Sequence, residues 1–267
     1  GSEMCIRDRA IAEPTLVRSK AVESIAGHFA AALTFNNDGT KMYTSAFLHT
    51  ARVDRIYEYD LTTAYNVSTA TLNTSILVGE YTGTSTFLHG AMQIVFNNDG
   101  TKMFIADHHK TIIEFTLTTP YDIDTASTTY NVGQGYDTNA NQKRPTSVAF
   151  NNDGTKMYVT GWIGDDINEY TLSTGFDVST ASFVDSFDVS SQEANPFGLA
   201  FNFYGTKMFV VGWTGDDINE YTLTTGFDVS TASYSGMSLS VLAEETKPRG
   251  YCFGSATRDH GNKLYVC

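Results

Sequence analysis

Apolar residues alternate with small or polar residues in short runs along most of the chain, and a period of two is typical of β-strands. In the run from Thr146 to Asn151, Val148 and Phe150 share one face of the expected strand. The turn Asn-Asp-Gly-Thr then ends that strand, because Asp caps backbone N–H groups and Gly supplies a positive φ. No helical period competes after Ala31. This part of the chain is expected to form four strands, at Thr146–Asn151, Lys156–Gly161, Ile167–Leu172 and Ala181–Val189.

The phrase Phe-Asn-Asn-Asp-Gly-Thr-Lys-Met repeats the strand–turn–strand unit. It stands intact at Phe35–Met42, Phe96–Met103 and Phe150–Met157, and with two changes at Phe201–Met208; a worn fifth copy surrounds Gly261. The turn glycines are 61, 54, 51 and 56 residues apart. Repeats of roughly 40 to 50 residues with strand content are typical of β-propeller blades, each a four-stranded antiparallel sheet. The sequence therefore predicts an all-β propeller.

The copies predict five blades in a single domain spanning residues 10–267. Repeats lie near residues 35–95, 96–149, 150–200 and 201–252, with a partial copy at 253–267. Residues 10–34 would complete the fifth blade, with strands at about Ile6–Leu16 and Val17–Gly27, because a closed ring leaves fewer exposed sheet edges. The alternative is a fragment of a six- or seven-bladed propeller. Residues 1–9 match no repeat and resemble translated adapter read-through, so we expect them to be a non-native leader.

Segment lengths indicate which face of the propeller carries function. From the Met of the second strand to the aromatic residue of the third, the separations are 17, 12, 13 and 13 residues. From that aromatic residue to the Ala that opens the fourth strand they are 11 in every copy, and from that Ala to the next strand Phe they range from 20 to 26. The loops of unequal length share one face, which we call the variable face; the opposite one is the uniform face. Binding residues gather on loops of a rigid scaffold.

Two Gly-Trp-x-Gly-Asp-Asp loops are the sharpest candidate site on the variable face. Their Trp rings could stack on a sugar ring while the carboxylates accept hydroxyl protons, or adjacent carboxylates could hold Ca²⁺. The alternative is a hairpin turn whose Asp residues cap backbone groups and whose Trp seals the blade edge. A doubled constellation fits a structural or multivalent role better than a single active site. The residues are Trp162, Asp165, Asp166, Trp213, Asp216 and Asp217.

Four further residues are added to the expected ligand site: His49 and Arg52 in the first blade, and His108 and His109 in the second. The two adjacent histidines could ligate a metal, but neighbours on a strand point to opposite faces and no third ligand is evident. An exposed polar loop is the alternative. We expect no metal site here and identify no catalytic residue.

A Glu recurs in the third strand of each blade, at Glu58, Glu114, Glu169 and Glu220. A ring of acids could be catalytic, as in propeller glycosidases. Identical placement in every blade favours a structural role instead.

Composition narrows the range of partners. The chain has 267 residues, a formal charge of −13 and a pI near 4.7. An acidic chain repels phosphate backbones, which argues against nucleic acid. No stretch approaches the roughly 18 apolar residues of a membrane helix, so we expect no membrane insertion. A bridge between Cys252 and Cys267 requires that two neighbouring strands bring them together.

Asp-Gly-Thr-Lys-Met-Tyr-Val at Asp153–Val159, followed by Ile-Asn-Glu-Tyr-Thr-Leu at Ile167–Leu172, resembles the YVTN and lactonase-like propeller repeats. The Asp-Val-Ser-Thr-Ala phrases look like repeats in uncharacterised proteins of marine bacteria and their phages. The resemblance covers residues 30–267 and implies the propeller fold. It implies no single activity, because propellers host many. No position here matches the hallmark lactonase residues, so no residue role is carried over.

These patterns together favour a non-enzymatic binding module that takes a glycan or protein ligand on the variable face. We expect a monomer without a cofactor, located outside the cell or on a virion surface. A propeller hydrolase of glycosidase or lactonase type, with an axial active site, is the alternative class. A structural repeat module of a larger secreted or virion protein is a third hypothesis.

Overall fold

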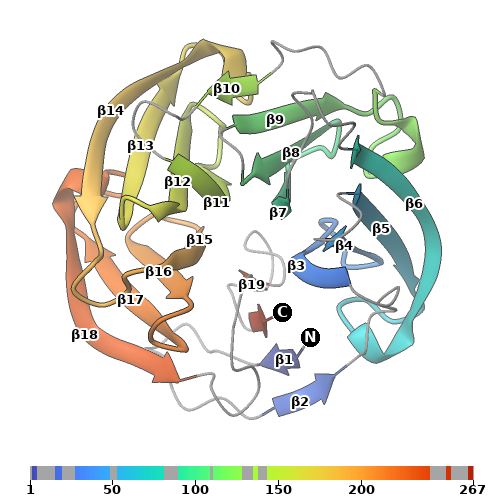
Figure 1. Cartoon of the computed structure of the whole chain (residues 1–267), viewed down its shortest axis with the longest axis horizontal. Coiled ribbons are helices and arrows are strands. Elements are labelled where there is room, and N and C mark those ends of the chain that lie inside the picture. The colour runs from blue at the N-terminus through green and yellow to red at the C-terminus, as the bar shows by residue number, and fades with distance from the viewer. Residues whose placement is uncertain are drawn as a thin grey trace.

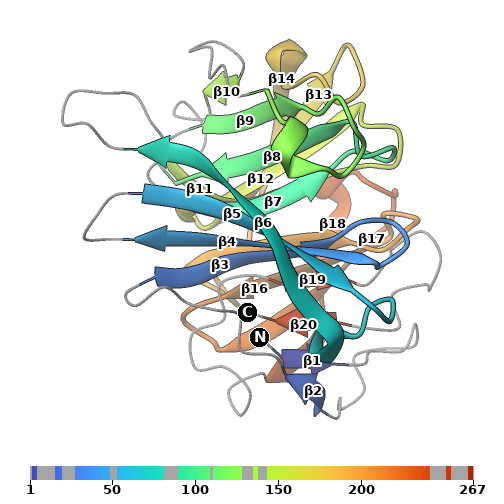
Figure 2. The ribbon, with the colours of Figure 1, turned by 90° about the vertical axis from the view of Figure 1, so that its right-hand side faces the viewer.

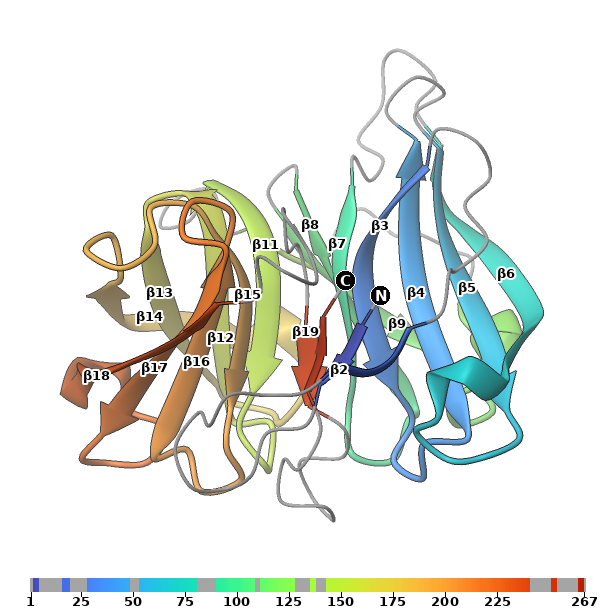
Figure 3. The same cartoon turned by 90° about the horizontal axis from the view of Figure 1, so that it is seen from below.

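The computed structural model describes residues 2–4, 16–19, 28–48, 53–80, 90–108, 111–127, 135–137, 143–240, 251–253 and 264–266. These residues form five four-stranded sheets. Figure 1 shows the sheets standing around a ring, and Figure 3 shows the same ring from the side. This arrangement confirms the predicted all-β propeller.

Four blades are built from consecutive strands. Blade 1 contains β3 (His28–Phe35), β4 (Lys41–Leu48), β5 (Val53–Leu61) and β6 (Ala70–Glu80); blade 2 contains β7 (Ala91–Phe96), β8 (Lys102–Asp107), β9 (Thr111–Thr116) and β10 (Gly135–Asp137). Blade 3 contains β11 (Lys143–Phe150), β12 (Lys156–Ile163), β13 (Asp166–Leu172) and β14 (Ala181–Asp188); blade 4 contains β15 (Pro196–Phe201), β16 (Lys207–Gly212), β17 (Asp217–Leu223) and β18 (Ala232–Ser240). The first strand of each is innermost, and Figure 2 shows β6 crossing β5 and β4 with the twist expected of a sheet.

Both ends of the chain supply the fifth sheet, in the order β19 (Tyr251–Phe253), β20 (Leu264–Val266), β1 (Ser2–Met4) and β2 (Leu16–Ser19). The pairing of β1 with β20 confirms that N-terminal strands complete the last blade. The third strand of this blade lies at Ser2–Met4, within the expected leader, and not at Ile6–Leu16. Cys252 lies on β19, which pairs with β20, whereas Cys267 falls outside the described residues.

The outer strand of blade 2 is described only in part. The outer strands of blades 1, 3 and 4 begin at the expected Ala, directly after a short 3₁₀ helix: η1 (Val67–Thr69), η3 (Val178–Thr180) and η4 (Val229–Thr231). In blade 2, Ala126 after η2 (Ile123–Thr125) bridges Leu117, just as Ala70 pairs with Leu61 in blade 1, and the described part of the outer strand is β10. Residues 128–134 lie outside the described residues, so a strand opening at Ala126 stays a prediction.

The repeated phrase forms the turn between the first two strands of blades 1 to 4. In blade 3, the carboxylate of Asp153 accepts hydrogen bonds from the N–H of Thr155 at 3.0 Å and from its hydroxyl at 2.6 Å. Gly154 has φ +72°, and a Cβ there would lie 2.3 Å from the ring of Phe176, which packs over it from the next turn of the blade. Backbone conformation and a close aromatic neighbour therefore both require glycine.

The hydrophobic core lies largely between blades. In blades 2, 3 and 4, the Phe that ends the inner strand packs against an aromatic residue in the second strand of the preceding blade. The ring centroids are 4.6 Å apart for Phe96 and Tyr43, 4.6 Å for Phe150 and Phe104, and 4.5 Å for Phe201 and Tyr158. The repeat thus fixes blade-to-blade stacking as well as the turn.

The recurrent Glu joins each of blades 1, 2 and 3 to the next blade. Glu169 is buried, pairs with Lys156 of its own blade at 2.7 Å, and accepts the N–H of Val229 in η4 of the next blade at 3.0 Å. Glu58 and Glu114 accept the equivalent N–H groups of η2 and η3 at 3.3 and 3.2 Å. These contacts support the structural role for the repeated acids.

Candidate functional site

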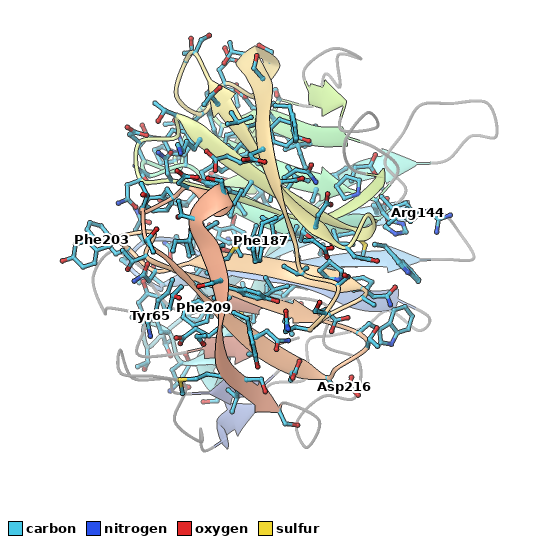
Figure 4. All side chains as sticks on the ribbon, turned by 90° about the vertical axis from the view of Figure 1, so that its left-hand side faces the viewer. Tyr65, Arg144, Phe187, Phe203, Phe209 and Asp216 are labelled. Carbon is cyan, nitrogen blue, oxygen red and sulfur yellow. The ribbon has the colours of Figure 1, made fainter. Side chains whose placement is uncertain are left out.

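The two faces of the propeller can be followed in Figure 4. Asp216, between the second and third strands of blade 4, and Arg144, near the start of β11, lie at one side of the view. Phe203 and Tyr65, which belong to turns of the uniform face, lie at the opposite side. The candidate residues described below sit on the side of Asp216 and Arg144, the variable face.

Four aromatic rings from blades 2, 3 and 4 meet on the variable face. Trp162, near the end of β12, and Trp213, just after β16, have ring centroids 5.2 Å apart in an edge-to-face arrangement. Both lie against Phe197, at 5.6 and 5.7 Å, and the ring of His108 lies 5.7 Å from Trp162. Met92 packs into the same group. We call these five residues the aromatic cluster.

β-Bulges at the start of β7 and β15 position the base of the cluster. In β7 the strand pairing skips Met92, between Ala91 and Gln93, and in β15 it skips Phe197, between Pro196 and Gly198. A bulge re-aims the side chain of the extra residue. Met92 and Phe197 are buried, whereas the two Trp rings above them are half-buried. The Trp rings are therefore anchored from beneath and keep part of their surface in solvent.

The Asp residues of the two Trp loops stabilise the turns in which they lie. Asp165 and Asp216 have positive φ values of 54° and 49°, as a tight connection requires. Asp166 and Asp217 each accept the side-chain amide of the Asn two residues further on, at 3.0 and 2.8 Å. Burial, with a smaller contribution from Asp188, raises the pKa of Asp165. Burial is also the largest cause of the raised pKa of Asp217.

A buried carboxylate holds the second Trp loop in place. Glu193, which precedes β15, accepts the backbone N–H groups of Asn195 at 2.8 Å, Thr214 at 3.1 Å and Gly215 at 3.1 Å. Three such bonds satisfy the carboxylate and fix the loop that follows Trp213. The Trp213 ring is thus presented on a rigid support.

Asp54, in β5 of blade 1, is a buried acid that the repeat pattern does not account for. The residue is 2% exposed, and its Oδ2 atom accepts the N–H of Gly90 at 3.0 Å. The carbonyl of Gly90 in turn accepts the N–H of His108 at 3.1 Å, which leads to the aromatic cluster. Burial raises the pKa of Asp54 to about 6, although the Gly90 bond acts in the opposite direction.

The structure brings together only part of the predicted site. Trp162, Trp213 and His108 meet directly, and the four Asp residues lie in or beside the turns next to the Trp rings. His49, Arg52 and His109 fall outside the described residues. Sequence reasoning missed Asp54, Met92 and Phe197. The only signal for Asp54 was its residue type, because Asp is depleted in strands.

Two absences apply to the described part of the chain. It contains no group of three or more His, Cys, Asp or Glu side chains placed to hold a metal ion. It also contains no helix with the length and hydrophobicity needed to cross a membrane.

Comparison with known proteins shows similarity of fold. No family model and no curated protein matches the chain, so the likeness to YVTN repeats stays a resemblance. Among solved structures, the chain is similar to a putative 6-phosphogluconolactonase from Bacteroides uniformis, with TM-score 0.54 and 11% identity over 99% of this chain and 70% of that one. A periplasmic gluconolactonase from Pseudomonas aeruginosa gives 0.53 and 15% over 88% and 62%.

A protein of unknown function from Desulfotomaculum acetoxidans gives a TM-score of 0.50 and 16% identity, over 84% of this chain and 59% of that chain. The chain therefore spans about three fifths of this protein and of the Pseudomonas enzyme. At these identities the likeness shows the propeller fold, in agreement with the five sheets, and leaves activity to be argued from the site.

Proposed function

We propose that this protein is a binding module that takes a glycan or protein ligand on the variable face, with the aromatic cluster as its platform. One observation carries the proposal: two half-buried Trp rings from neighbouring blades are anchored on buried Phe197 and Met92. Rings fixed in this way lose little conformational entropy when a ligand stacks on them. Their aromatic faces suit a sugar ring or an apolar side chain equally well.

Polar groups around the cluster support the same role. Arg144, near the start of the inner strand β11, is exposed on the same side of the propeller as Asp216. The Oδ1 atom of Asp216 is buried and accepts no hydrogen bond within the described part of the chain. A ligand hydroxyl or N–H group that reached this oxygen would satisfy it, which adds direction to apolar stacking.

A glycan array screened with single and double Trp variants tests the proposal. We expect Trp162→Ala and Trp213→Ala each to weaken binding of a selected glycan by about tenfold or more, since stacked aromatic residues dominate such interfaces. Ile163→Ala is the matched control, because Ile163 neighbours Trp162 and is 45% exposed. Binding that survives the double Trp variant would refute the site. If no glycan is retained, cross-linking through a photoreactive group at position 163 would test for a protein ligand in the same way.

A hydrolase is the second candidate function, and the observation that favours it is Asp54. A buried carboxyl group with a pKa near 6 is suited to proton transfer, and strongly shifted acids are concentrated at active sites. Two of the similar structures carry lactonase names. A panel of sugar lactones and aryl glycosides would test this reading. Turnover with a pH limb near 6 that disappears in Asp54→Asn would support it, and absence of turnover across the panel would count against it.

A further inference from the structure

The fourth copy of the repeated turn presents two aromatic side chains to solvent. Phe203 and Tyr204 stand where the other three turns have Asn and Asp. They are 40% and 69% exposed, and their rings meet edge to face at 5.2 Å. Figure 4 shows Phe203 projecting from the side opposite Asp216, so this pair lies on the uniform face, away from the aromatic cluster.

With Phe203 and Tyr204 in place of Asn and Asp, this turn lacks side-chain hydrogen bonds that the other turns form. In blade 3, the Asp at this place accepts two hydrogen bonds from Thr155, and the side-chain amide of Asn152 donates to the carbonyl of Phe203 in the next blade at 2.9 Å. Tyr204 has no carboxylate to cap the turn, and the Phe203 side chain has no amide to donate. The exchange also exposes apolar surface to water. Folding therefore does not explain the pair.

The turn itself keeps its shape without the Asp. Gly205 has φ +67°, close to the value in the other copies, and Phe227 packs over it. Asn202 still accepts the N–H of Lys207 at 3.0 Å and donates to the hydroxyl of Thr206 at 3.1 Å. The two aromatic side chains are thus held on a rigid turn that needs neither of them.

Carboxylates lie on the turns beside the pair. Asp153 is exposed on the adjacent turn, and hydrogen bonds from Thr155 lower its pKa, which keeps it ionised. Asp228 lies two residues after Gly226, where an added Cβ would lie 2.3 Å from the carbonyl oxygen of Tyr204. The nearby Lys207 is paired with Glu220 at 3.1 Å. The whole chain is also strongly acidic.

We propose that Phe203 and Tyr204 form a second binding site, for a cationic segment of a protein partner. A guanidinium or ammonium group can lie over an aromatic face while neighbouring carboxylates compensate its charge. Exposed aromatic residues at the centre of a polar rim are typical of interface anchors. Anionic lipid surfaces fit the site poorly because the same carboxylates repel them.

The test restores the consensus of the repeat. The probe is a fluorescein-labelled peptide of alternating Arg and Gly, with Glu and Gly as the matched negative probe, and binding is measured by fluorescence anisotropy at low and moderate salt. The double variant Phe203→Asn, Tyr204→Asp removes both rings and adds a carboxylate. We expect it to bind the Arg peptide about tenfold more weakly than the original chain, as loss of a cation–π anchor predicts.

The design separates the proposal from nonspecific attraction. If only net charge held the peptide, the variant would bind as tightly or more tightly, and that result would overturn the proposal. Undetectable binding by the original chain, or equal retention on neutral phosphatidylcholine vesicles, would overturn it as well. The variant regains turn hydrogen bonds, so we expect its melting temperature to be unchanged or higher. Loss of binding therefore cannot be ascribed to unfolding.

Discussion

Replacing Asp54 by Asn should make the protein more stable at neutral pH. Asp54 is 2% exposed, and burial raises its pKa from 3.8 to about 6. Its Oδ2 atom accepts the N–H of Gly90, and an Asn carbonyl oxygen can accept that bond equally well. The substitution therefore removes a charge that the interior disfavours and keeps the contact.

The size of the effect follows from the change in pKa. Between about pH 4 and pH 6 the folded chain holds a proton that the unfolded chain has released, so the free energy of unfolding falls as pH rises. A difference of about two pKa units corresponds to roughly 3 kcal/mol at 1.36 kcal/mol per unit. The ionised carboxylate therefore lowers stability by that amount above pH 6, and by nothing below pH 4.

Urea unfolding followed by circular dichroism at several pH values measures the effect. We expect Asp54→Asn to exceed the original chain by up to about 3 kcal/mol at pH 8, with the gap closing toward pH 4. Asp60→Asn is the matched control, because Asp60 is in the same strand but its side chain is 58% exposed. A gap that is equal at pH 4 and pH 8, or a less stable variant at pH 8, would refute the reasoning.

Two further predictions concern the repeated elements. Gly154→Ala should cost about 2–4 kcal/mol by urea unfolding, because Ala at positive φ is strained and its Cβ would meet the Phe176 ring at 2.3 Å. Gly236→Ala is the control, because Gly236 has φ +83° and no atom lies within 4 Å of an added Cβ. Only the backbone strain of about 1 kcal/mol should then lower its free energy of unfolding. Equal losses in the two variants would contradict the packing argument. Glu169→Ala should cost about 2–4 kcal/mol, since the buried N–H of Val229 loses its acceptor, and a loss under 1 kcal/mol would argue against an inter-blade clamp.

The fold could be predicted from the sequence because the residues that form each turn and stack the blades lie within one short repeated phrase. The Asp153 cap, the Gly154 turn and the Phe150 stacking residue all lie within eight consecutive positions. Local hydrogen bonds and a period of two are visible in one copy, and repetition confirms them. The fifth blade shows the limit of this reasoning. Its third strand, β1, lies at Ser2–Met4, where no copy of the repeat stands, and only its pairing with β20 identifies it.

The candidate site was harder to predict because it depends on contacts between blades. The Trp loops were identifiable as motifs, but nothing in their spacing showed that Trp162 and Trp213 would meet over Phe197. Met92 and Phe197 occupy bulges, and a bulge breaks the alternation from which side-chain direction is inferred. Glu193 supports its loop through backbone N–H groups, which any sequence offers.

Departures from the repeat therefore indicate function better than the repeat itself does. The Glu that recurs in every blade seemed a ring of acids, but where the next 3₁₀ helix is described it accepts that helix's N–H, so repetition there reflects assembly. Asp54 accepts a loop N–H and not the N–H of a 3₁₀ helix. Phe203 and Tyr204 replace the Asn and the capping Asp that the other three turns contain. A feature that lowers stability at one blade alone is not explained by folding, and selection for binding or chemistry is the remaining physical reason to retain it.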